Sequence, residues 1–235
     1  MSASALSGSS GGLTAAASSL ALAEVARERA GLYRLLATLF RTEPSRDLLV
    51  SLREDEIRDA LREAGMRLED SFFTDPIDTQ FDELAVDFTN LFLLPGVMLS
   101  PHESVQLAGG SGLLRGPETA VVRDYYDHVG FSVDESTPME PDHLSIELEF
   151  LGHLASEEAE AREADDAQRA LDALRYQEDF LKRHLGRWVF PFLDKVAEKC
   201  ETAFYAELAR LCSDFLVEQR ELLPQLIDQG SSSEA

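Results

Sequence analysis

The chain has 235 residues, of which 44% are hydrophobic and 8% aromatic, a composition typical of a globular protein and not of a disordered one. Its 44 acidic and 21 basic residues give a formal net charge of −23, which argues against nucleic acid as a partner. The charge fits either a protein kept soluble in a salty cytoplasm or an acidic docking surface.

The two cysteines, Cys200 and Cys212, form neither a CxxC pair nor a Cys/His cluster. We therefore expect no zinc site and no disulfide framework, and we expect a reduced, cytoplasmic setting. No run of 18 or more apolar residues is present, so no transmembrane helix is expected. Residues 1–18 and 230–235 are rich in small and polar residues and are expected to be flexible tails.

The spacing of apolar residues predicts helices over 19–41, 45–51 and 54–64, the last ended by Gly65. A turn at 75–78 precedes a further predicted helix that runs to about Leu93 and has an unusually aromatic face, including Phe88 and Phe92. We interpret this face as core packing, and an apolar groove for a partner peptide is the alternative.

The segment 94–116 is rich in glycine and proline and contains Pro101, Glu103 and Ser104. Connections of this length inside a helical protein are often functional. Ser104 lies in no G-x-S-x-G elbow and nothing positions His102 as its base, so we expect no catalytic residue here. The next predicted helix starts with Pro117 near its first turn and ends at Gly130.

Two prolines, Pro138 and Pro141, stiffen the chain before a strong helical pattern. We expect Asp142 to be the N-cap of that helix, and His143 and Glu147, four residues apart, to form a hydrogen-bonded pair. Together they would make a polar cluster at a hinge. The alternative is a capped, buried helix in which His143 only satisfies a neighbour.

Further helices are predicted over 171–185, from Pro191 to Lys199, and over 202–221, and the charged run 157–166 is expected to be exposed. Since no stretch alternates like a strand, the chain is predicted to be all-α. We expect a helical bundle of two lobes, 19–130 and 143–229, joined by a proline-rich hinge over 131–142.

Three motifs, in order along residues 20–220, carry a family resemblance. The run Glu140-Pro141-Asp142-His143-Leu144, followed by Glu147-Leu148 and Phe150-Leu151, resembles the E-P-x-D-H-x-x-x-E-L-x-F motif of the TorD/DmsD family of redox-enzyme maturation chaperones, without the spacer before Asp142. Leu91-Phe92 and 101–105 resemble its L-F and P-x-E-S elements. The C-terminal element Q-x-x-F-x-x-x-H-L-x-x-W-x-x-x-F is matched by Gln177, Phe180, His184, Leu185, Trp188 and Phe192.

The resemblance implies a non-enzymatic cytoplasmic chaperone. Its partners would be the catalytic subunit of a molybdenum oxidoreductase and the twin-arginine signal peptide, or leader, of that subunit, with no cofactor of its own. Independently of the resemblance, exchange of helices about the hinge is a route to a homodimer. A peptide with an arginine pair next to an apolar segment requires a binding site in which carboxylates lie beside apolar surface. The residues expected to bind the leader are Glu140, Pro141, Asp142, His143, Leu144, Glu147, Phe150, His184 and Trp188, with Phe88, Phe92, Pro101, Glu103 and Ser104 as secondary candidates.

Two alternatives come from other classes of protein. A carboxylate-bridged metal-binding bundle requires Glu-x-x-His motifs on two facing helices, and the single such run in this chain, Glu140-x-x-His143, contains Pro141 and precedes its helix, so no metal ligands are expected. A nucleotide-dependent enzyme would require a glycine-rich phosphate loop, and the chain has none.

Overall fold

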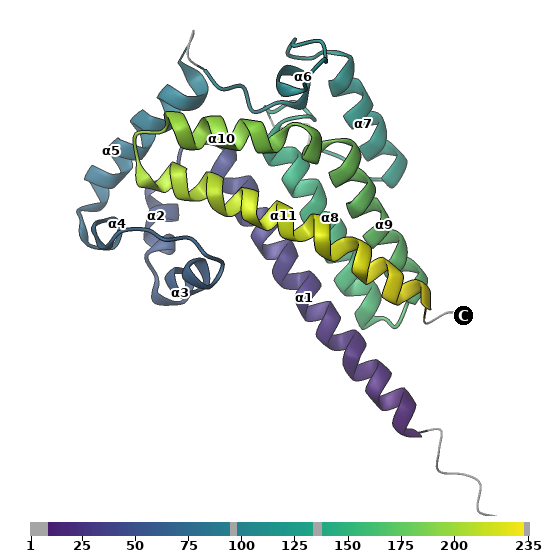
Figure 1. Ribbon diagram of the computed structural model, residues 1–235. Coiled ribbons are helices and arrows are strands. Elements are labelled where there is room, and N and C mark those ends of the chain that lie inside the picture. The colour runs from purple at the N-terminus through teal and green to yellow at the C-terminus, as the bar shows by residue number, and fades with distance from the viewer. Residues whose placement is uncertain (1–8, 95–97, 134–137, 233–235) are drawn as a thin grey trace, which may run out of the picture.

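The computed structural model describes residues 9–94, 98–133 and 138–232. Within these ranges the chain forms α-helices and two short helical turns, with no strand, which confirms the all-α prediction (Figure 1). No helix in these ranges is both long and apolar enough to cross a membrane. The elements are α1 (Ser9–Arg41), α2 (Arg46–Leu52), α3 (Asp55–Glu63), α4 (Asp70–Thr74), α5 (Ile77–Phe88), η1 (Thr89–Leu93), α6 (Glu103–Gln106), α7 (Pro117–Val129), α8 (Leu144–Glu163), α9 (Ala167–Arg183), η2 (Leu185–Arg187), α10 (Val189–Lys199) and α11 (Ala203–Ser232).

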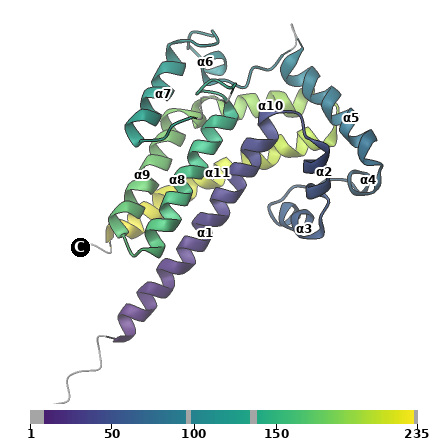
Figure 2. The same cartoon turned by 180° about the vertical axis from the view of Figure 1, so that it is seen from behind.

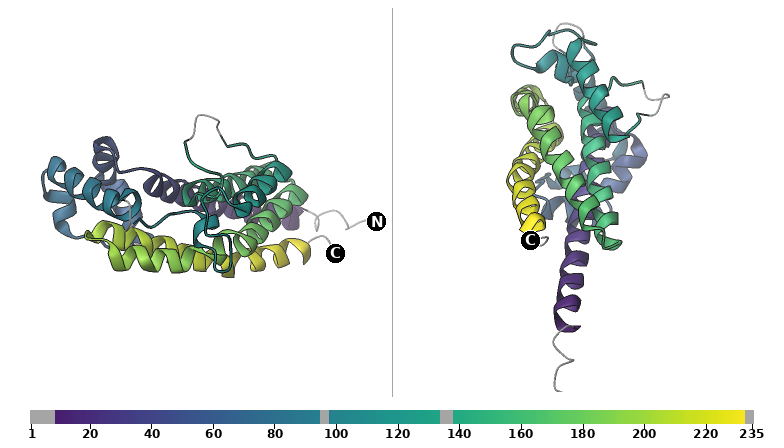
Figure 3. Two further views of the ribbon diagram at one scale, coloured as in Figure 1. Left: turned by 90° about the horizontal axis from the view of Figure 1, so that it is seen from above. Right: turned by 90° about the vertical axis from the view of Figure 1, so that its right-hand side faces the viewer.

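Four long helices build the body of the protein. Helix α1 packs along α8 in the most extensive helix–helix contact, α8 packs on α9, and α9 packs on α11 (Figures 1 and 2). Gly152 allows α1 and α8 to approach closely, because a Cβ at this position would lie 3.1 Å from the Cβ of Tyr33. Helices α2–α5 and helix α7 lie toward opposite ends of this body (Figure 3).

Local signals explain where the shorter helices begin and end. Ser45 caps α2 by accepting a hydrogen bond from the Leu48 amide at 3.1 Å, and Gly65 follows α3 with a φ of +96°. Helix α7 has Pro117 at its start and a left-handed Gly130 at its end. The expected helix to Leu93 is α5 followed by the π-helical turn η1, in which the Leu94 amide donates to the Thr89 carbonyl.

The aromatic face of α5 and η1 is part of the core. Phe88 and Phe92 are each 5% exposed, their ring centroids lie 4.9 Å apart, and both rings contact Tyr205 of α11. Phe92 also contacts Phe192 of α10. The core interpretation is confirmed for Phe88 and Phe92, which are buried among the described residues and do not line an open groove there.

Both expected tails are shorter than predicted. Helix α1 begins at Ser9 and not near residue 19, since the run Ala15–Ala17 has high helix propensity and continues the helix. Helix α11 continues past Glu221 and through Pro224 to Ser232. The remaining parts of the expected tails, 1–8 and 233–235, lie outside the described residues.

One continuous core crosses the expected boundary between two lobes. Helix α1, assigned to the first lobe, packs mainly on α8, assigned to the second, and α5 meets α11 through Leu84 and Tyr205. The buried apolar side chains form a single cluster that draws on all the long helices. The segment 131–142 therefore does not separate two cores. Its residues 134–137 lie outside the described ranges, and a hinge there stays a prediction.

A buried polar network ties the four long helices together. Arg29 of α1 donates to Glu158 of α8 at 2.9 Å and to Gln219 of α11 at 2.7 Å, and it also contacts Gln177 of α9. Gln177 in turn donates to Glu158 at 3.1 Å. Glu158 is 1% exposed, so the prediction that 157–166 is an exposed charged run is wrong for this residue, whose charge is balanced by Arg29 and Arg162.

Candidate functional site

The motif residues meet where two segments distant in sequence pair with each other. Residues 100–104 run antiparallel to 141–144 through an isolated bridge between His102 and His143. The Glu103 amide donates to the Asp142 carbonyl at 3.0 Å, and the Leu144 amide donates to the Pro101 carbonyl at 2.8 Å. This pairing joins the start of α6 to the start of α8.

Asp142 and His143 cap two different helices. The Asp142 carboxylate accepts a hydrogen bond from the Ser104 amide of α6 at 2.9 Å, whereas the N-cap of α8 is His143, whose Nδ1 accepts from the Ser145 amide at 3.1 Å. The prediction that Asp142 caps the following helix is therefore wrong by one residue, because its carboxylate turns to the start of α6 instead. Burial, with His102 and Arg41 nearby, lowers the pKa of His143 to about 3 and keeps the ring neutral.

Glu147 lies fully buried beneath this pairing. Its Oε2 accepts a hydrogen bond from the Trp188 indole at 3.3 Å, and its Oε1 has no partner. The expected side-chain pair between His143 and Glu147 does not form, because the His143 ring is held by Ser145. Burial raises the pKa of the Glu147 carboxyl well above its usual range, and the nearby Glu103 and Asp142 carboxylates raise it further. Burial and the neighbouring carboxylates thus favour the protonated form of Glu147 in the folded protein.

Aromatic and histidine side chains pack around Glu103, Pro141 and Glu147. His184 Nδ1 lies 3.2 Å from Oε2 of Glu103, and the His184 ring stacks on Phe180 with centroids 5.0 Å apart. Phe150 packs against Phe180 and Tyr126, and the Tyr126 hydroxyl donates to the Pro141 carbonyl at 3.0 Å. Tyr126 was not among the predicted site residues, because its only signal in the sequence is its position on the apolar face of the helix that ends at Gly130.

Most of the predicted leader-binding residues are thus brought together, but inside the protein. We call the group of Glu103, Asp142, His143, Glu147, His184 and Trp188 the buried acid cluster. All six side chains are at most 4% exposed, and Leu144, Phe150, Pro101 and Ser104 around them are also buried. Of the primary candidates, only Glu140 and Pro141 are partly exposed, and Glu140 forms an ion pair with Arg115 at 2.6 Å. The expected acidic rim of Asp142 and Glu147 is therefore not at the surface.

Gln177, His184 and Trp188 of the C-terminal motif do not lie on one continuous helix. Helix α9 ends at Arg183, and His184 has a non-helical backbone with φ −122° and ψ −96° before η2 begins. Trp188 then precedes α10, which starts at Val189 because Pro191 is tolerated within a first helical turn. All three side chains are nevertheless buried, Gln177 in the Arg29 network and the other two in the buried acid cluster.

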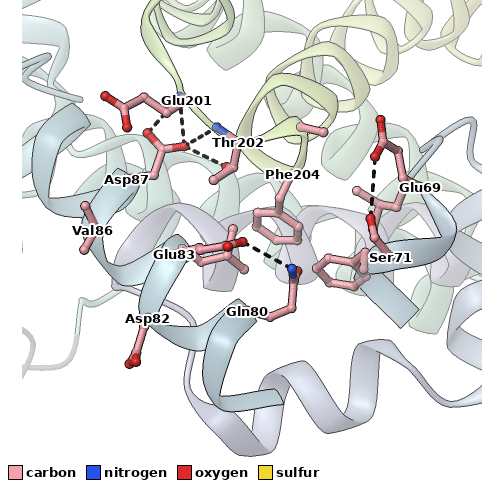
Figure 4. Close-up of a pocket in the computed structure, with 14 residues that line it drawn as sticks. Glu69, Ser71, Gln80, Asp82, Glu83, Val86, Asp87, Glu201, Thr202 and Phe204 are labelled. Carbon is pink, nitrogen blue, oxygen red and sulfur yellow. Dashed lines mark hydrogen bonds between the residues drawn. The ribbon is translucent and has the colours of Figure 1, made fainter. Parts of the chain in front are cut away.

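An open cavity of about 620 Å³ lies between α4, α5 and the turn that joins α10 to α11 (Figure 4). Its lining includes five carboxylates, and none of its lining residues is Lys, Arg or His, so we call it the acidic cavity. Asp87 of α5 closes one side by accepting hydrogen bonds from the Glu201 and Thr202 amides and from the Thr202 hydroxyl. The five acidic residues are Glu69, Asp82, Glu83, Asp87 and Glu201.

The acidic cavity could not be predicted from the sequence. Its lining comes from three separate stretches of chain, 68–72, 80–87 and 201–204, which are brought together only by the packing of α5 on α11. None of these stretches carries a motif of its own. Among the described residues, no group of three or more His, Cys, Asp or Glu side chains is placed to hold a metal ion.

The described residues thus form an all-helical protein with a closed polar cluster and an open acidic cavity. The model of the nitrate reductase delta subunit family matches residues 54–194, more than half of the chain. The chain is 29% identical over 216 residues to the chaperone protein TorD of Vibrio cholerae, covering 86% of this chain and 94% of that protein. It is 30% identical over 202 residues to the chaperone protein TorD of Vibrio parahaemolyticus, covering 80% and 91%.

The chain therefore belongs to the nitrate reductase delta subunit family, within its TorD/DmsD group of maturation chaperones. The family resemblance of the three motifs is confirmed, and the relatives are named as chaperones and not as enzymes. A solved structure of a redox enzyme maturation protein from Archaeoglobus fulgidus has a TM-score of 0.49 and 22% identity, covering 83% of this chain and 93% of that one.

Proposed function

We propose that this protein is a cytoplasmic chaperone for a molybdenum oxidoreductase of the dimethyl sulfoxide or trimethylamine oxide reductase type. It binds the twin-arginine leader and the cofactor-free form of that enzyme and assists cofactor insertion before export. The observation that carries the proposal is the similarity to TorD chaperones over 86% of the chain.

The net charge of the chain and the burial of the buried acid cluster support different roles for the protein surface and for this cluster. A leader carries an arginine pair and an apolar segment, and a chain with a net charge of −23 attracts such a cation before any contact forms. The six side chains of the buried acid cluster are closed to solvent, which supports an indirect role for them in leader binding. The proposed role of the cluster is to fix the pairing of 100–104 with 141–144, from which the partly exposed Glu140 and Pro141 project.

Location and oligomeric state complete the proposal. Cys200 and Cys212 are free thiols, which fits a reducing compartment. Exchange of helices about 131–142 is the proposed route to a homodimer, and it requires α1 of one copy to pack on α8 of the other. Light scattering of the purified protein distinguishes monomer from dimer.

The proposal predicts selective binding of an arginine-pair leader. We expect the protein to bind a synthetic leader peptide from a molybdenum oxidoreductase of the same organism saturably in a calorimetric titration. A peptide with the pair replaced by two lysines should bind at least about tenfold more weakly, because only guanidinium groups pair bidentately with carboxylates.

Raising the salt concentration should weaken leader binding. The carboxylates that the leader can reach are exposed, and added salt screens their charge. Absence of saturable binding to any leader, or equal binding of the arginine and lysine peptides, would contradict leader recognition. A parallel titration with the cofactor-free catalytic subunit lacking its leader measures the contribution of the mature enzyme separately.

A further inference from the structure

We infer that the acidic cavity between α4, α5 and the α10–α11 turn binds the arginine side chains of the client's leader. This inference rests on the proposed function and specifies where in the fold the leader binds. The buried acid cluster, to which the motifs pointed, has no accessible carboxylate, whereas the acidic cavity has several.

The charge around the acidic cavity is of one sign. Glu69, Asp82, Glu83 and Glu201 are exposed around it, and no basic side chain belongs to its lining to neutralise them. The carboxylates make few contacts of their own: Glu83 accepts from Gln80 at 3.3 Å and Glu69 from Ser71 at 3.5 Å (Figure 4). Their acceptor capacity therefore remains available to a ligand.

The arrangement of these acids selects for an extended cation. They form no group close enough to hold a metal ion, so a single small cation gains little from them. A guanidinium group presents five donors in a planar fork and pairs bidentately with a single carboxylate. A cavity of about 620 Å³ also lies within the roughly 300–1,000 Å³ range of ligand pockets.

Apolar side chains within the lining suit the rest of an arginine-bearing peptide. Phe72 and Phe204 stack with ring centroids 5.5 Å apart, and Leu84 is buried beside them. Val86 of α5 is 56% exposed and also belongs to the lining. Phe72, Phe204 and Leu84 are at most 5% exposed and form the floor of the cavity, so the methylene stem of an arginine packs on Val86 while its charged end stays among the carboxylates.

Asp87 makes the cavity rigid. It is 1% exposed and holds the Thr202 amide at 2.8 Å and the Thr202 hydroxyl at 2.7 Å, which fixes the start of α11 against α5. A preformed site loses less conformational entropy when a peptide binds. Asp87 thus acts as a positioning residue and its carboxylate is not free to bind a guanidinium group.

The test removes three charges without removing the side chains. The triple variant Glu69→Gln, Glu83→Gln and Glu201→Gln should bind the arginine-pair leader at least about tenfold more weakly than the wild type in the calorimetric titration. All three residues are exposed, so helix content and thermal midpoint should be unchanged. The matched control changes the net charge equally by replacing Glu28, Glu218 and Glu221, which are exposed and lie outside the cavity, and it should bind within about twofold of the wild type.

The outcomes separate this inference from the proposed function. Leader binding by the wild type that the cavity variant retains would overturn the inference and leave the chaperone proposal standing. Absence of leader binding by the wild type would overturn both. A change in the self-association of the cavity variant without peptide would show that a second copy of the chain occupies the cavity, which would also overturn the inference.

Discussion

Replacing Arg29 by methionine is expected to lower the free energy of unfolding by about 3–5 kcal/mol, the usual effect of removing one partner of a buried ion pair. Arg29 is 6% exposed and donates to side chains of three other long helices. Methionine fills a similar volume but leaves Glu158 and two glutamines without their shared donor. Urea unfolding followed by far-ultraviolet circular dichroism measures the difference.

A matched control is available two residues earlier on the same helix. Arg27 also contacts two carboxylates, those of Glu24 and Glu163, but its side chain is 46% exposed. Arg27→Met should therefore change the free energy of unfolding by only about 0–1 kcal/mol. Equal effects of the two substitutions would show that the buried network does not hold the long helices together.

Replacing Glu147 by glutamine is expected to make the free energy of unfolding less dependent on pH above about 4.5. Burial, with Glu103 and Asp142 close by, raises the pKa of Glu147 in the folded protein above its ordinary value of 4.5. At pH values below 4.5 this group is protonated in both states and has no effect on the pH dependence. Above pH 4.5 the unfolded carboxyl ionises while the folded one keeps its proton, so folding is opposed by up to about 1.4 kcal/mol per pH unit until the raised pKa is reached.

The glutamine variant lacks this titration and keeps an acceptor for the Trp188 indole. The difference in free energy of unfolding between the variant and the wild type should shift in favour of the variant as the pH rises above 4.5 in urea titrations, because only the wild type loses stability through this titration. Glu149→Gln is the control, because Glu149 lies two residues further along α8 with a side chain 46% exposed. A glutamine variant whose stability runs parallel to the wild type over this range would show that Glu147 is ionised in the fold.

Patterns within single helices carried most of the fold prediction. The apolar spacing of 19–41 and the flanking Pro117 and Gly130 located α1 and α7, because core-facing stripes and end signals are local properties. The ends of the chain were less predictable, since the extension of α1 to Ser9 and of α11 to Ser232 lies beyond the clear apolar stripes.

The site could be predicted only in part because burial depends on partners far away in sequence. The motif around Asp142 and His143 was correctly identified as a cluster, but its closure depends on segment 100–104, some 40 residues earlier. Glu158 was expected at the surface because Arg29, its partner, lies 129 residues away. The acidic cavity has no motif at all, since three unrelated stretches line it.

The most direct test of the account is hydrogen–deuterium exchange of the wild-type protein with and without the arginine-pair leader, beside the lysine-pair control. The account predicts that the arginine leader slows amide exchange in 69–87 and 200–205, around the acidic cavity, and leaves 100–104 and 140–147 unchanged. Protection confined to 100–104 and 140–147 would contradict it and place the leader at the buried acid cluster.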